Sequence, residues 1–108
     1  MIREIEAFRL RVPLRETYHL SHRSLTHFES VLVIVQDEGK EAYGEAKAGA
    51  AYFGESEEES WQFILLHGPK ILGVEAQVAF DQLAPFRVSN PCSATSIMTA
   101  VEQLFTGV

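Results

Sequence analysis

Little in this 108-residue sequence points to export, a membrane or a disulfide framework. The single cysteine, Cys92, has no second cysteine with which to form an internal disulfide. The first six residues, Met1 to Glu6, contain acidic side chains where a signal peptide needs a basic region and then an apolar one. The longest clean apolar run, Val31 to Val35, is far too short to span a bilayer. We therefore expect a cytoplasmic protein that does not contact a membrane.

Basic residues are also scarce. Nine lysines and arginines against 15 aspartates and glutamates give a formal net charge of −6. A nucleic-acid-binding protein needs a basic face, so this balance argues against nucleic acid as a partner. With 46% apolar and 22% charged residues, the composition is typical of a globular domain and argues against disorder. At this length we expect one domain with a modest core.

The first strand is predicted over residues 2–13, where apolar and arginine side chains alternate. This alternation predicts a half-buried strand that ends near Pro13 and has three inward side chains, Phe8, Leu10 and Val12. The next stretch, Leu14 to Glu29, is polar and has no period, so we expect a loop. A loop of that length inside a compact domain is unusual, and such loops are often functional.

Two further strands and a second irregular segment follow. Residues 30–36 form a β-branched run without alternation, which predicts a strand covered on both faces. Asp37-Glu38-Gly39 is a hairpin signal, so residues 41–46 should return as the third strand of an antiparallel meander. Residues 47–55 show no regular period.

Helices are predicted over residues 57–67, 75–83 and 91–105. Ser56 with Glu59 forms a capping box before the first helix, and Asn90 is the expected cap of the last one. The expected inward side chains are Trp61, Ile64 and Leu65 in the first helix, Val78, Ala79 and Leu83 in the second, and Ala94, Ile97, Met98, Val101, Leu104 and Phe105 in the third. Strands followed by helices predict the α+β class, here a three-stranded antiparallel meander followed by a small bundle of about three helices.

The polar loop contains the residues that most invite a chemical interpretation. His19, His22 and His27 could form a zinc site, but their spacing fits no compact ligand pattern and no cysteine or paired carboxylate lies nearby. The alternatives are a solvated loop, or side chains that point at a ligand. Ser21 or Ser24 beside a histidine could suggest a nucleophile, but closeness in sequence is not triad geometry.

The remaining candidates also have plain structural explanations. Glu57 to Glu59 could form an acidic metal patch, but three acids suit the positive end of a helix. Cys92 at a helix start is either a reactive thiol or a small packing residue. Tyr52 and Phe53 are adjacent aromatics on an irregular segment; one can project while the other packs, or both can fold back. None of these groups supplies a base with a partner, a metal shell or an oxyanion hole, so we assign no catalytic and no metal residue.

Short stretches in a fixed order carry a family resemblance. They are Ile2-x-x-Ile5-Glu6-x-Phe8-x-Leu10-x-Val12-Pro13-Leu14, Tyr18-His19-Leu20-Ser21, Val31-Leu32-Val33, Gly39, Gly44-Glu45-Ala46, Tyr52-Phe53-Gly54-Glu55, Ile71-Leu72-Gly73, Asn90 and Ala100-Val101-Glu102. In this order and at these separations, the chain resembles the amino-terminal capping domain of the mandelate racemase and muconate lactonizing family of the enolase superfamily. After Glu102 the sequence departs from the family, which continues with an Ala-Leu and an Asp.

The resemblance implies the same meander-plus-helices fold and a role. In that family this domain caps a carboxy-terminal (β/α) barrel, and its loops close over the barrel mouth and contact the substrate. The family chemistry is proton abstraction α to a carboxylate, with Mg²⁺ stabilising the enediolate and a barrel Lys or His as base. The residues implied to contact substrate are Tyr18, His19, Ser21 and His22 in the first loop, and Tyr52 and Phe53 in the second.

The barrel and its catalytic and metal-binding residues would lie beyond Val108. We therefore expect residues 1–108 to form a single capping domain that is inactive alone and holds no cofactor. Its intact parent would be a Mg²⁺-dependent racemase, epimerase, cycloisomerase or dehydratase acting on a carboxylate-bearing small molecule. Exposed apolar surface should make the isolated chain self-associate. The alternative is a freestanding small α+β binding or interaction module, which a downstream reading frame for barrel strands would exclude.

Overall fold

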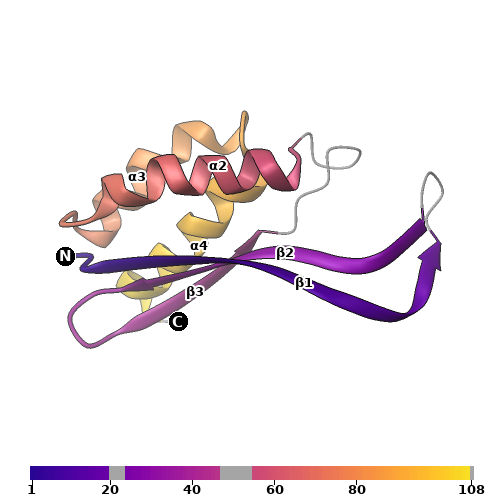
Figure 1. Ribbon diagram of the computed structural model, residues 1–108. Helices are drawn as coiled ribbons and strands as arrows, with labels where there is room; N and C mark the ends of the chain where they lie inside the picture. The colour runs from indigo at the N-terminus through magenta and orange to yellow at the C-terminus, as the bar shows by residue number, and fades with distance from the viewer. Residues whose placement is uncertain (20–23, 47–54, 108) are drawn as a thin grey trace.

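The computed structural model describes residues 1–19, 24–46 and 55–107, and within 11–19 and 24–29 it describes the backbone alone. In these residues an antiparallel sheet of three strands, in the order β1-β2-β3, precedes three α-helices, which pack on one of its faces (Figure 1). This arrangement confirms the predicted α+β class. The elements are β1 (Glu4–His19), β2 (Ser24–Gln36), β3 (Glu41–Ala46), α2 (Glu57–His67), η1 (Gly68–Ile71), α3 (Ala76–Leu83), η2 (Ala84–Arg87) and α4 (Pro91–Thr106).

The first two strands form a much longer ribbon than predicted. Most of the stretch from Leu14 to Glu29, expected to be a loop, is strand, and only residues 20–23 lie outside the described part of it. The strands pair up to Pro13↔His27, then continue after a shift in register to His19↔Ser24. The loop prediction was wrong because main-chain hydrogen bonds hold a two-stranded ribbon without any alternation of polar and apolar side chains. Figure 1 shows the ribbon extending beyond the helices.

The inward face of β1 is also the opposite of the predicted one. Phe8 is 42% exposed and Leu10 is 37% exposed, whereas Ile5 and Ala7 pack against the core. The strand begins at Glu4, and the buried Ile2 precedes it, with its N–H donating to the carbonyl of Val74 at 2.9 Å. Directly paired residues share a face, and the register sets Ile5 and Ala7 opposite two fully buried valines of β2. Pairing with β2 therefore determines which side chains of β1 face the core.

Only one face of β2 is fully covered. Val31, Val33 and Val35 face the helices and are fully buried, whereas Leu32 and Ile34 on the other face are half-buried. The expectation that both faces would be covered is thus wrong for the described residues. The hairpin that follows is as predicted, with Gly39 at φ +82° and the Asp37 N–H donating to the Lys40 carbonyl at 3.0 Å.

The buried face of α2 is shifted from the predicted one, and the buried face of α3 differs from the prediction at Val78 alone among the three predicted residues. In α2 the buried residues are Ser60, Phe63 and Ile64, and Leu65 is 49% exposed. In α3, Ala79 is buried and Val78 is 47% exposed. In α2 the true stripe follows the i, i+3, i+4 spacing but begins one residue before the assumed position, whereas in α3 Leu83 is buried as predicted, together with Ala79. No helix among the described residues has the combined length and apolar character that crossing a membrane requires.

The last helix, α4, packs on the sheet through small side chains. Its buried residues include Ser93, Ser96 and Ala100, together with the predicted apolar face except Phe105, which is 38% exposed and meets the Phe80 ring edge-on. On β3 the alternate, buried positions include Gly44, where an added Cβ would lie 1.9 Å from the Ser96 carbonyl oxygen. The strand and the helix are therefore in direct backbone contact.

We predict that Gly44→Ala destabilises the domain by about 1–3 kcal/mol, because β3 or α4 must move to admit the methyl group. Urea denaturation monitored by circular dichroism measures the change. Glu45→Ala is the matched control, since Glu45 is the next residue of the same strand and is exposed. Its effect should stay within about 0.5 kcal/mol. Equal stability of Gly44→Ala and the wild type would show that the strand and helix are not in close contact.

Candidate functional site at the hairpin end

The structure places part of the predicted substrate-contact set at the far end of the β1–β2 ribbon. Tyr18 pairs with Leu25 and His19 pairs with Ser24, so both residues end strand β1 (Figure 1). They were predicted to lie in a loop and instead lie at the end of a strand. A strand fixes the backbone of a residue more firmly than a long loop does.

The other predicted contact residues lie outside the described part of the chain. These are Ser21 and His22 in the first segment and Tyr52 and Phe53 in the second. What the structure does show is how the residues on either side of the second segment are held. Ala46 ends β3, and Glu55 is fully buried one residue before the cap of α2.

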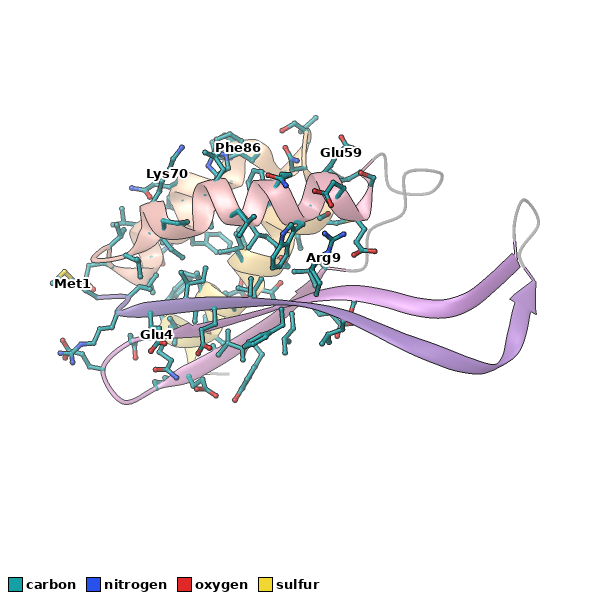
Figure 2. All side chains as sticks on the ribbon, viewed as in Figure 1. Met1, Glu4, Arg9, Glu59, Lys70 and Phe86 are labelled. Atoms are coloured by element: carbon teal, nitrogen blue, oxygen red, sulfur yellow. The ribbon has the colours of Figure 1, made fainter. Side chains whose placement is uncertain are left out.

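Arg9 joins β1 to the first turn of α2 (Figure 2). Its Nε and Nη2 donate to Glu57 Oε1 at 3.0 and 2.9 Å, and its Nη1 donates to Glu58 Oε2 at 2.9 Å. The guanidinium carbon lies 5.6 Å from the centroid of the Trp61 ring, within cation–π range. The hydrogen bond to Glu57 is the largest effect on the pKa of Arg9, which is raised. Because β1 leads into the ribbon, this contact orients the base of the hairpin against the helices.

The start of α2 has the predicted cap. The Glu59 N–H donates to Ser56 Oγ at 3.1 Å, and the Ser56 N–H donates to Glu59 Oε1 at 3.0 Å, which is a complete capping box. Glu57 and Glu58 therefore have structural roles beside the helix N-terminus and against Arg9. Their function as a metal-binding patch receives no support from this geometry.

Glu55 caps α4 from a distance of about 35 residues along the chain. Its carboxylate accepts from the Cys92 N–H at 2.7 Å, the Ser93 N–H at 3.2 Å and Asn90 Nδ2 at 3.3 Å, and also from the Ser93 hydroxyl. Asn90 occupies the N-cap position of α4, as predicted, but its side chain donates to Glu55 and makes no capping bond. A carboxylate carries more negative charge toward the helix dipole than an amide oxygen does.

The charge state of Glu55 follows from these contacts. Burial acts to raise its pKa, but the hydrogen bonds from Ser93, Cys92 and Asn90 outweigh it, and the pKa is lowered. Burial and the nearby Glu55 charge raise the pKa of the Cys92 thiol. A raised pKa disfavours the nucleophilic thiolate, so Cys92 fits the packing interpretation and not the reactive one.

Among the residues described with side chains, His67 is the one histidine, and it lies in an aromatic cluster. Its ring centroid is 4.3 Å from that of Phe63 and 4.6 Å from that of Phe86. Burial and the charge of Lys70 lower its pKa. No three His, Cys, Asp or Glu side chains within the described ranges converge to hold a metal ion. His19 and His27 are strand residues whose side chains lie outside the description, so the zinc interpretation of the loop histidines stays untested.

Sequence reasoning missed Arg9 and Glu55. Arg9 was interpreted as the solvent-facing half of an alternating strand, and Glu55 as part of an irregular segment. The three acids after residue 56 could have indicated that a cation lies nearby. For Glu55 there was no local signal, because its partners begin at Asn90.

Neither a protein-family model nor a curated protein sequence matches the chain. Solved structures do match. The dipeptide epimerase of Enterococcus faecalis V583, complexed with Mg and the dipeptide L-Leu-L-Tyr, superimposes with a TM-score of 0.81 at 21% identity, over 98% of this chain and 31% of that chain. The N-succinyl Arg/Lys racemase of Bacillus cereus ATCC 14579 gives a TM-score of 0.80 at 24% identity, over 96% of this chain and 30% of that chain.

A third match bears the family name to which the sequence resemblance pointed. It is a Roseovarius nubinhibens ISM protein, provisionally identified as a mandelate racemase/muconate lactonizing enzyme and complexed with magnesium, with a TM-score of 0.82 at 18% identity over 98% of this chain and 30% of that one. The chain thus has the fold of one part of these racemases and epimerases and spans about 30% of their length. The resemblance proposed from sequence is confirmed at the level of the fold.

We predict that Arg9→Met lowers the urea midpoint and shifts the emission of Trp61, the single tryptophan in the chain. The variant keeps an apolar stem but loses the bonds to Glu57 and Glu58. Because charge attraction is screened by salt, the difference from wild type should shrink in 1 M NaCl. Arg3→Met is the control, since Arg3 pairs with Glu38 on the exposed hairpin side and should change neither quantity appreciably. An unchanged Trp61 spectrum in Arg9→Met would contradict the assigned contact.

Proposed function

We propose that this chain is the substrate-capping and specificity domain of a Mg²⁺-dependent enzyme of the enolase superfamily. The intact enzyme would abstract a proton α to a carboxylate, as a racemase, epimerase, cycloisomerase or dehydratase. Residues 1–108 would form one capping domain without catalytic activity of its own. The observation that carries this proposal is the fold match over 96–98% of this chain and about 30% of each enzyme.

The described residues give the capping role a physical basis. The β1–β2 ribbon extends beyond the helices, with Tyr18 and His19 at its far end. Arg9, near its base, bonds to Glu57 of α2. Ala46 and Glu55, the residues on either side of positions 47–54, are both buried. Residues presented on rigid elements can orient a substrate and exclude water from a neighbouring reaction centre. We propose Tyr18, His19, Ser21, His22, Tyr52 and Phe53 as the substrate-contact residues.

Magnesium would belong to the rest of the parent enzyme. Two of the three matched structures described above hold Mg or magnesium, and one of these two also holds a dipeptide. Within the described residues of this chain no cluster suited to a metal ion exists. We propose that the carboxylate-bearing substrate and Mg²⁺ are bound mainly by the partner barrel, with the capping segments completing the site. A cytoplasmic location remains an expectation from the sequence.

The rival is a freestanding interaction module with the same fold. The outer face of the sheet argues against it, because Phe8 and Tyr43 are 42% and 48% exposed beside half-buried Leu32 and Ile34. A freestanding module should cover its own apolar faces. The expected self-association of the isolated chain stays a prediction with the same physical origin. The genomic sequence after the Val108 codon decides between the two functions, since the capping role requires a frame encoding barrel strands with a Lys-x-Lys motif.

We predict that the isolated chain shows no racemase, epimerase, cycloisomerase or dehydratase activity, with or without Mg²⁺. No base paired with a metal shell is present in its described residues. Proton–deuterium exchange at the α-carbon of carboxylic acids and dipeptides, followed by NMR, is the measurement. Calorimetric titration with Mg²⁺ should show no saturable heat. Specific exchange catalysed by purified protein would overturn the assignment of an inactive domain.

In the intact parent, Tyr18→Ala or Tyr52→Ala should reduce kcat/KM by roughly 10–100-fold with little change in Tm, because each removes an aromatic contact that orients the substrate. Tyr43→Ala is the control, since Tyr43 lies on the outer face of the sheet and is 48% exposed. It should leave kcat/KM unchanged. If Tyr18→Ala and Tyr52→Ala instead cost about 3–5 kcal/mol of stability, these residues are core packing and their assignment fails.

A further inference from the structure

The face of the sheet opposite the helices has an apolar centre. Leu32 and Ile34 lie on the central strand β2 and are half-buried. Strand pairing places Phe8 of β1 beside Leu32 and Tyr43 of β3 beside Ile34, and these two rings are 42% and 48% exposed. No described part of the chain packs on this face, since the helices all lie on the other one (Figure 1). A contiguous apolar surface of this kind marks a site of contact with another molecule.

Exposed carboxylates flank this apolar centre on both outer strands. They are Glu4 and Glu6 on β1, and Glu41 and Glu45 on β3. The outward positions of residues 4–10, 30–36 and 41–46 contain no lysine or arginine, and the ion pairs found among the described side chains involve none of these four carboxylates. A hydrogen bond from the Tyr43 hydroxyl lowers the pKa of Glu41. The face is therefore apolar along its middle and negatively charged along both sides.

The dimensions of the face match those of an α-helix. Neighbouring strands lie about 4.8 Å apart, so the carboxylate-bearing strands β1 and β3 are separated by about 10 Å across β2. A helix with its side chains is about 10–12 Å across. The outward residues from Glu4 to Leu10 extend over about 20 Å, the length of about 13 helical residues. A helix along β2 would set its apolar stripe on Leu32 and Ile34 and its flanking side chains beside the carboxylates.

From this pattern we infer that the outer face of the sheet docks an amphipathic α-helix of another polypeptide chain, with lysine or arginine on both sides of its apolar stripe. Charge complementarity selects this occupant. A second copy packed face to face would bring two sets of four carboxylates together, and anionic lipids would be repelled in the same way. The self-association expected of the isolated chain is therefore opposed by charge at this face and should strengthen with salt. A domain that needs this cover acts within a complex, not as a freestanding module.

A synthetic peptide of about 18 residues, long enough to form a helix once bound, tests the surface. It carries leucine at the i, i+3, i+4 and i+7 positions of a helix and lysine on both sides of that stripe. NMR titration of the nitrogen-15-labelled 108-residue chain should show saturable shifts of the Leu32, Ile34 and Tyr43 amide signals. The same peptide with glutamate in place of lysine should cause none. Affinity for the lysine peptide should fall by roughly tenfold between about 0.05 and 0.5 M NaCl, because salt screens the charges at the rim.

Two double variants with the same change in net charge separate the face from the molecule as a whole. Glu6→Lys with Glu45→Lys reverses one carboxylate on each side of the face and should weaken binding of the lysine peptide by about tenfold or more. Asp81→Lys with Glu102→Lys alters exposed residues of α3 and α4 and should weaken it by less than about threefold.

Phe8→Ala and Leu65→Ala form a second matched pair, for the apolar part of the face. The two side chains are 42% and 49% exposed, Phe8 on the outer face of the sheet and Leu65 on α2, so neither substitution should prevent folding. Phe8→Ala should weaken binding by about tenfold, because an aromatic side chain near the centre of a contact contributes strongly to affinity. Leu65→Ala should leave the affinity unchanged.

Three results would overturn the inference. Equal losses in the two double variants, or full affinity in Phe8→Ala, would mean that the peptide responds only to the net charge of −6. Dimerisation of the chain through Phe8 at low salt, in preference to peptide binding, would assign the face to a second copy. Loss of peptide binding in the intact parent would show that its own remaining chain covers the face. None of these measurements uses catalysis or the proposed substrate-contact residues, so the proposed function can stand if this inference fails.

Discussion

The approach of β3 to α4 at Gly44 is the constraint on which the arrangement of the domain depends. A strand and a helix come into backbone contact only where both carry small side chains, and Gly44 meets Ser96 without room for a methyl group. At that separation Gln103 can bond both main-chain groups of Tyr43, accepting from its N–H at 3.3 Å and donating to its carbonyl at 3.0 Å. The free edge of β3 is thereby closed at Tyr43.

Once α4 is packed on the sheet, contacts with its first turn position Glu55 and the start of α2, which follows Glu55 in the chain. Glu55 is attached there, and Glu57 and Glu58, two and three residues further along the chain, meet Arg9 on β1. The ribbon, α2 and α4 are therefore joined by four charged groups close together in space. The two ion pairs of Arg9 lie at the surface and contribute modestly to stability, whereas the Glu55 carboxylate is buried and accepts several hydrogen bonds.

The sequence predicted features that local rules determine. The order of strands and helices, the Gly39 hairpin and the Ser56 capping box each depend on residues within a few positions of one another. Local rules could not predict which side chains of β1 face the core, nor that Glu55 binds the first N–H groups of α4. Phe8 and Leu10 alternate correctly for a buried face, but the register with β2 overrides that pattern.

The candidate site was predictable only in part for the same reason. The ribbon that carries Tyr18 and His19 extends beyond the helices, and its sequence does not alternate between polar and apolar residues, so periodicity did not identify it as a strand. The family resemblance supplied the candidate contact residues, whereas the roles of Arg9 and Glu55 in joining distant segments were apparent only from the structure. Both residues bond to segments more than 30 residues away in the chain, and periodicity within one element does not predict such contacts.

A cap supplied from a distant residue has a different consequence from a local one. Had Asn90 capped α4, the start of that helix would be stable wherever Glu55 lay, because cap and helix would be adjacent in the chain. With Glu55 as the cap, the hydrogen bonds from the Cys92 and Ser93 N–H groups to its carboxylate form only when the residue before Ser56 is in place. The amino-terminal end of α4 and Glu55 must therefore be ordered together. The free energy of capping α4 therefore also opposes displacement of Glu55 and of the start of α2 that follows it.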